Sequence, residues 1–158
     1  MSNDFYQYVV DKFIFKVRKG LVYTEDDLWI DTKNCRFQIG VTDFLQRRGG
    51  DVVFVELPKI GSKVTQGEEL AQLETIKAVI SLKSPMSGTV TEANLQLVEK
   101  PEKINEDPYG EGWLVTFSEP KRECASKKLL AAEQYLELIE LKIQDDIKRS
   151  KKEAVKVV

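Results

Sequence analysis

Short apolar runs recur along the middle of the chain, and turn-forming or charged residues separate them. The runs are Leu28–Ile30, Arg36–Ile39, Val52–Leu57, Glu69–Leu73, Val79–Leu82, Thr89–Thr91 and Trp113–Phe117. Their lengths and their content of branched and aromatic side chains are typical of strands. Glycine and proline between the runs mark turns, so the connections are short. The pattern predicts a mainly β fold with a core of short strands.

The spacing of apolar residues becomes helical after Pro120. The positions that follow it are Leu129, Ala132, Leu136, Ile139, Ile143 and Ile147. They lie three or four residues apart, with charges between them, which predicts a C-terminal amphipathic α-helix. A shorter helical segment is predicted over Thr42–Arg47, where Thr42 or Asp43 can cap the first turn. Near the N-terminus, Phe13–Val17 is predicted to form a short strand or a docking segment.

A weak internal similarity divides the strand-rich region into two halves. Gly61–Leu70 and Gly88–Leu97 share an order of turn, strand and closing leucine. Lys77 lies between the two segments, at the predicted tip of a hairpin. Taken alone, such a lysine is an ordinary solvated residue, because the chain has 24 lysines and arginines.

Composition restricts the classes of function. Hydrophobic residues make up 42% of the 158 residues, which indicates one folded domain rather than a disordered chain. The net charge of −2 leaves no basic field for nucleic acid or membrane phosphates, so protein partners are expected. The chain has no histidine, which removes the commonest general base and the commonest neutral metal ligand. An enzyme or metal site is therefore disfavoured.

Cellular location is predicted from what the sequence contains near its ends and in its apolar runs. No run approaches the ~18 apolar residues of a membrane span, and the N-terminus does not resemble a signal peptide. We therefore expect a cytoplasmic protein. Cys35 and Cys124 lack the spacing of a metal site, and we expect both to be reduced thiols.

The segment with candidate chemistry is Glu74-Thr75-Ile76-Lys77-Ala78. Other motifs accompany it: Ile39–Asp43, Gly50–Pro58, Ser84–Gly88, Asn105–Trp113 and Leu130–Tyr135. Together, and in this order, they closely resemble the H proteins of the glycine cleavage system from about Val22 to Glu140. Several separated motifs are much more specific than one pentapeptide.

The resemblance implies a flattened hammerhead-type lipoyl barrel or sandwich, with lipoate in amide linkage on Lys77. Amide formation removes the ammonium charge and leaves a long arm that ends in a dithiolane. Glu74, Thr75, Ile76 and Ala78 would form the hairpin that the lipoylating enzyme recognises, although Glu74 fits an ordinary exposed strand end equally well. We expect an N-terminal extension over residues 1–20, a lipoyl β domain over 21–120, and a C-terminal helix and tail over 121–158.

The resemblance also implies a non-catalytic carrier, in which the cofactor supplies the chemistry and the protein supplies placement. In glycine cleavage the partners would be glycine decarboxylase, aminomethyltransferase and dihydrolipoamide dehydrogenase. One departure concerns Leu28, where the family has a glutamate that holds the loaded arm in a surface cleft. A leucine cannot pair with an ammonium group. Asp27, one position away, is expected to point to the opposite face.

Three functions follow from these features. The change at Leu28 and the two terminal extensions favour an H-like lipoate-binding protein that serves sulfur oxidation with a heterodisulfide-reductase-like complex. The alternative is a glycine cleavage H protein that carries the aminomethyl group. A further alternative is a non-lipoylated structural adaptor with a bare Lys77, which the intact hairpin motif disfavours. Biotin carriage is disfavoured because Ile76 and Ala78 stand where biotin carriers have methionine.

Overall fold

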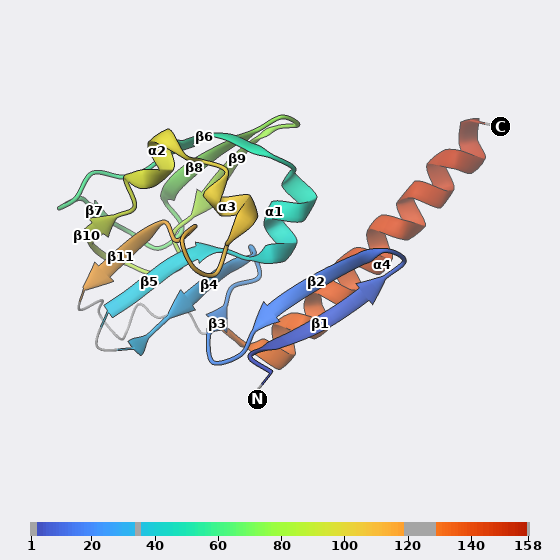
Figure 1. Cartoon of the computed structure of the whole chain (residues 1–158), viewed down its shortest axis with the longest axis horizontal. Helices are drawn as coiled ribbons and strands as arrows, with labels where there is room; N and C mark the ends of the chain where they lie inside the picture. The colour runs from blue at the N-terminus through green and yellow to red at the C-terminus, as the bar shows by residue number, and fades with distance from the viewer. Residues whose placement is uncertain (1–2, 34–35, 119–128, 158) are drawn as a thin grey trace.

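Strands dominate the computed structural model, which describes residues 3–33, 36–118 and 129–157 (Figure 1). The strands are β1 (Phe5–Val10), β2 (Phe13–Arg18), β3 (Val22–Tyr23), β4 (Leu28–Asp31), β5 (Arg36–Val41), β6 (Val52–Glu56), β7 (Lys63–Val64), β8 (Glu69–Thr75), β9 (Val79–Lys83), β10 (Gly88–Ala93), β11 (Val115–Ser118) and β12 (Leu130–Ala131). The helices are α1 (Asp43–Gly49), α2 (Gln96–Glu99), α3 (Lys103–Glu106) and α4 (Ala132–Val157). The predicted mainly β fold is confirmed, and each apolar run that predicted a strand overlaps one.

Two antiparallel sheets form the barrel. The larger sheet has the strand order β12-β3-β4-β5-β11-β10-β7, and the smaller sheet has the order β6-β8-β9. Strands β8 and β9 form a hairpin in the smaller sheet, with Glu74 opposite Val79 at its outer end. In Figure 1 this hairpin extends beyond the barrel close to α1.

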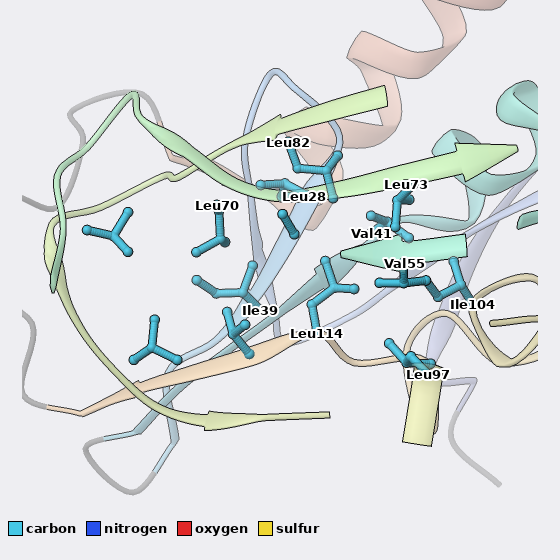
Figure 2. Packing of buried hydrophobic residues seen from close by; sticks show 14 of the residues in the cluster. Leu28, Ile39, Val41, Val55, Leu70, Leu73, Leu82, Leu97, Ile104 and Leu114 are labelled. Carbon is cyan, nitrogen blue, oxygen red and sulfur yellow. The ribbon is translucent and has the colours of Figure 1, made fainter. Parts of the chain in front are cut away.

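Apolar side chains from both sheets fill the barrel. Figure 2 shows Leu73 and Leu82 from the smaller sheet above Ile39 from the larger one, and all three are almost fully buried. Burying one such side chain contributes about 1.5–3 kcal/mol. This packing fixes the direction of the β8–β9 hairpin relative to the barrel.

Leu28 belongs to the same core. Its side chain is 1% exposed and lies in the cluster between the sheets, and its strand pairs it with Val41 of β5. Position 28 therefore does not line a surface cleft. The expectation that Leu28 removes a carboxylate from such a cleft is wrong for this chain, because the strand register turns this side chain inward.

The N-terminal segment forms a hairpin, β1–β2, that packs with α4 in a second core cluster. The strand predicted near Phe13–Val17 is confirmed as β2, whereas its partner β1 was not predicted. The C-terminal helix is confirmed, and Ile139 and Ile143 are buried as its spacing predicted. It begins at Ala132 rather than Leu129, because Leu130 and Ala131 pair with β3 as strand β12.

Trp29 and Tyr109 are buried in this second cluster, with Trp113 partly buried against it, so the three are packing residues. The predicted short helix is confirmed as α1, and the Thr42 side chain caps it by accepting from the Leu45 N–H. Within the described ranges, no helix is both long and apolar enough to cross a bilayer. Cys35 and Cys124 lie outside the described residues.

A buried polar network joins α4 to the barrel. The Tyr135 hydroxyl donates to Asp27 Oδ1 at 2.9 Å and lies 2.7 Å from Thr42 Oγ1, which donates because Tyr135 has only one hydroxyl proton. Lys142 Nζ lies 2.9 Å from the same Asp27 oxygen. Burial raises the pKa of Asp27, and the Lys142 ammonium and the Tyr135 hydroxyl oppose that rise. Asp27 thus points away from Leu28 toward α4, as predicted.

A Tyr135→Phe variant tests this network. We expect a loss of about 1–3 kcal/mol in the free energy of unfolding, because the Thr42 hydroxyl and the Asp27 carboxylate lose a buried partner. Tyr8→Phe is the matched control, since it removes a solvent-exposed hydrogen bond between Gln144 and the Tyr8 hydroxyl. Urea unfolding monitored by circular dichroism measures both. Equal stability of the two variants would contradict a stabilising network.

Candidate functional site

The candidate site is the tip of the β8–β9 hairpin, where Ile76, Lys77 and Ala78 form the turn. All three side chains are exposed. Among the described residues, none forms an ion pair with the Lys77 ammonium. The geometry therefore leaves an accessible primary amine at the outermost point of a hairpin that the core holds in place.

Thr75 organises this turn from beneath. Its side chain is buried, and its Oγ1 accepts from the N–H groups of Lys77 and Ala78, each at 3.1 Å. The same hydroxyl donates to the Ala78 carbonyl at 3.2 Å, and the Thr75 N–H donates to that carbonyl at 2.8 Å. A single side chain thus satisfies the backbone of the turn, which fixes the position of the Lys77 backbone.

A second contact joins the tip to the segment between α1 and β6. The Ile76 N–H donates to the Asp51 carbonyl at 3.1 Å. Gly50 ends α1 at a φ of 85°, a conformation that favours glycine. The Lys77 Cδ and Cε atoms lie 3.5 Å from the position that a Cβ on Gly50 would occupy. The lysine side chain therefore lies across Gly50, toward α1.

Asn105 of α3 holds this supporting segment. Its Oδ1 accepts from the Val52 N–H at 2.9 Å, and its Nδ2 donates to the Gly50 carbonyl and to Gln46 Oε1, both at 3.1 Å. Sequence reasoning assigned no role at the lysine tip to Asn105, Gly50 or Asp51. The signal available was their position in the motifs Gly50–Pro58 and Asn105–Trp113, which flank the lysine motif in the sequence.

The outer face of the hairpin carries a row of exposed residues across the smaller sheet. The register places Glu74 between Phe54 of β6 and Val79 of β9. Phe54, Val79 and Ile76 are large apolar side chains that are more than half exposed. The predicted residues Glu74, Ile76, Lys77 and Ala78 thus share one accessible surface, whereas Thr75 supports it from inside. Exposed apolar groups beside a carboxylate are suited to recognition by another protein.

Comparison with known proteins agrees with this geometry. The family model described as glycine cleavage H-protein matches residues 21–142. The chain belongs to this family. The glycine cleavage system H protein of Rubrobacter xylanophilus is 46% identical over 125 residues, which cover 79% of this chain and 96% of that protein. A probable glycine cleavage system H protein of Pyrococcus horikoshii is 40% identical, over 79% of this chain and 93% of that protein.

A solved structure supports the fold of the H-protein family for this chain. The crystal structure of a glycine cleavage system H protein from Mycobacterium marinum superposes with a TM-score of 0.69 at 35% identity, over 75% of this chain and 95% of that one. The flattened lipoyl barrel implied by the resemblance is therefore confirmed. Proteins of the family carry covalently bound lipoate. An accessible lysine on a hairpin with an ordered backbone fits such an attachment.

Thr75→Val tests the role of the hydroxyl at the tip. Valine keeps the shape of the side chain but cannot accept from the Lys77 and Ala78 N–H groups. We expect the rate of lipoylation by a purified lipoylating enzyme to fall about fivefold to tenfold, because ordering the turn then costs roughly 1 kcal/mol or more. Thr75→Ser keeps the hydroxyl and should retain most of the rate. A Thr75→Val variant modified as fast as wild type would show that the turn needs no side-chain support.

Proposed function

We propose that Lys77 is the lipoyl attachment site and that the chain is a lipoyl carrier of the glycine cleavage system. The observation that carries the proposal is the exposed Lys77 at the β8–β9 tip, within a motif and a fold shared with the H-protein family. Glu74, Ile76 and Ala78 lie around it on the surface that a lipoylating enzyme would contact. Thr75 acts as a positioning residue for this tip.

The chain acts as a carrier, and its own residues supply placement rather than catalysis. Lys77 would hold lipoate in amide linkage, and the bound group would supply the disulfide chemistry for aminomethyl transfer among glycine decarboxylase, aminomethyltransferase and dihydrolipoamide dehydrogenase. The barrel presents the hairpin, and the Phe54–Glu74–Val79 row offers a docking surface. A structural adaptor with an unmodified Lys77 would not require the hairpin motif that surrounds this lysine.

Glycine cleavage now ranks ahead of sulfur oxidation. The main argument for a heterodisulfide-reductase-like partner was a missing carboxylate at Leu28, and that side chain lies in the core. The relatives compared above are H proteins of glycine cleavage, including one that is 46% identical. The other argument for sulfur oxidation was the presence of terminal extensions. These segments lie outside residues 21–142, the region that the family model matches.

A side-by-side assay tests the proposal. The lipoylated protein is supplied to glycine decarboxylase with glycine, and in parallel to a sulfur-oxidising heterodisulfide-reductase-like complex. We expect glycine-dependent release of carbon dioxide in the first assay at a rate comparable with that of an established H protein. Turnover only in the second assay would return the sulfur-oxidation function to first place.

A further inference from the structure

The β1–β2 hairpin has one open edge. Figure 1 shows β2 between the barrel and β1, so one edge of β1 faces away from the barrel. The Lys19 N–H donates to the Asp4 carbonyl across the hairpin at 2.8 Å, and the register has no shift. Because bonded and unbonded pairs alternate in an antiparallel ladder, the backbone N–H and C=O groups of Gln7 and Val9 point outward. Among the described residues, no hydrogen bond to these groups occurs.

The other edge of the hairpin, on β2, is covered by the barrel. The Lys16 N–H donates to Asp43 Oδ2 at 2.9 Å, and the Lys16 carbonyl accepts from the Tyr109 hydroxyl at 2.7 Å. The Tyr23 hydroxyl donates to the Arg18 carbonyl. The barrel therefore satisfies the edge that faces it, and a further strand could add only to β1.

Strand β1 lacks the features that usually protect an edge. Its sequence is Phe5-Tyr6-Gln7-Tyr8-Val9-Val10, with no charge and no proline, and its pairing contains no bulge. Lysine, proline and bulges are the common devices against unwanted pairing at such edges. The Val9 side chain is also 60% exposed. Both strands of the hairpin precede residue 21, so this edge lies outside the region that the family model matches.

Helix α4 extends the apolar support beside this edge. The Tyr6 hydroxyl donates to Glu133 Oε1 at 2.6 Å, and Gln144 Nε2 donates to the Tyr8 hydroxyl at 2.8 Å. Leu141 precedes Gln144 by three residues, so the two side chains are neighbours on the helix surface. The Leu141 side chain is nevertheless 69% exposed, so β1 does not cover it. A strand added to β1 would lie on this side of α4 and could cover the leucine.

We propose that a second copy of this chain adds its β1 to this edge and forms a symmetric dimer with a continuous sheet. In antiparallel pairing, Gln7 stands opposite Val9 of the second copy, and each such pair exchanges two backbone hydrogen bonds. This register satisfies all the outward groups of both residues in both copies. It also brings Lys12 close to Asp4 of the second copy, which has the opposite charge.

Two observations favour a second copy over another protein. The uncharged β1 can stand opposite itself without repulsion between like charges. The dimer also closes, because the outer strands of the joined sheet would be the two β2 strands, whose free edges the barrels already cover. The inference does not depend on lipoylation, and the tests below use the unmodified full-length chain.

The first test measures the oligomeric state by sedimentation equilibrium. The protein is examined from about 1 μM to about 500 μM. We expect a reversible monomer–dimer equilibrium with a dissociation constant on the order of 10 μM, as befits a small interface. A chain that remains monomeric over the whole range would overturn the proposal. Larger assemblies in place of a dimer would overturn it as well, because they would show that the sheet does not close.

A backbone variant shows whether the open edge forms the dimer. Val9→Pro removes the outward N–H but no hydrogen bond within the hairpin. Two donors are lost per dimer, so we expect the dissociation constant to rise at least about tenfold. Val9→Thr keeps the N–H and the branched side chain and should dimerise like wild type. Circular dichroism checks that both variants are folded. A folded Val9→Pro variant that dimerises as tightly as Val9→Thr would contradict pairing at this edge.

Side-chain variants test the register and do not require proline in a strand. Val9→Lys alone should weaken the dimer about tenfold, because lysine protects edge strands against pairing. The double variant Gln7→Glu/Val9→Lys should recover most of the affinity, since each glutamate then faces a lysine of the second copy. Leu141→Ser should weaken the dimer about fivefold, whereas Leu95→Ser, at another exposed leucine, should not. A double variant no tighter than Val9→Lys would refute the proposed pairing.

Hydrogen exchange locates the interface directly. The amides of Gln7 and Val9 should exchange rapidly in dilute protein and at least about tenfold more slowly at a concentration where the dimer predominates. The Tyr8 amide is the internal control, because it bonds within the hairpin and should be protected at both concentrations. A dimer that forms while the Gln7 and Val9 amides still exchange rapidly would place the interface elsewhere and overturn the proposal.

Discussion

A Lys77→Arg variant is expected to fold like wild type and to lose all carrier activity. The side chain is exposed and makes no ion pair among the described residues, so the free energy of unfolding should change by no more than ~0.5 kcal/mol. Arginine remains protonated and offers no free amine for amide formation, so lipoate cannot be attached. Glycine-dependent release of carbon dioxide in the reconstituted system should fall to the background without carrier.

Lys83→Arg provides the matched control, because Lys83 is an exposed lysine on β9 of the same hairpin. It should be lipoylated and active. Residual activity in Lys77→Arg would mean that another lysine carries the group. A large fall in melting temperature for Lys77→Arg would instead show that the lysine has a structural role at the tip.

Leu28→Glu is expected to destabilise the protein by about 4 kcal/mol or more. Its side chain is 1% exposed, and the residues of its cluster are all apolar, so a glutamate there would lose packing and leave a charge or a proton-bearing carboxyl group without a partner. This outcome distinguishes a core position from a surface cleft. In a cleft the same change would leave stability unaltered and prolong the lifetime of the loaded arm.

Two controls separate burial from chemistry. Leu28→Met keeps the side chain apolar and should cost less than ~1.5 kcal/mol. Leu95→Glu places the same carboxylate at a position that is 64% exposed, where the change should stay within ~0.5 kcal/mol. Urea unfolding of the unmodified proteins measures all three. A Leu28→Glu variant as stable as Leu95→Glu would show that position 28 is accessible and would revive the cleft argument.

The sequence was sufficient for features that depend on local pattern. The strand over Val79–Leu82 and the helix around Ile139 were predicted from the spacing of their apolar residues. That spacing depends only on which face of the single strand or helix is buried. A cap at Thr42 or Asp43 was predicted for the same reason, since a capping side chain acts within one turn, and the structure identifies Thr42 as the cap. The resemblance to the family then predicted the barrel and the candidate role of Lys77. The spacing of apolar residues alone indicates neither.

Features that depend on tertiary register were beyond the sequence. The inward direction of Leu28 follows from its pairing with Val41, and a one-residue shift would have placed it on the other face. The similarity between Gly61–Leu70 and Gly88–Leu97 breaks at its end, where Leu70 enters strand β8 and Leu97 enters helix α2. Asn105 supports the tip through contacts more than fifty residues away in sequence, which no local pattern could indicate.

The most direct test of the account is the mass of the protein after incubation with lipoate, ATP and a lipoylating enzyme that modifies an established H protein. The account predicts a single lipoyl addition, located by peptide mapping on Lys77. An addition on any other lysine, or an unmodified chain under conditions in which the established protein is fully converted, would contradict it.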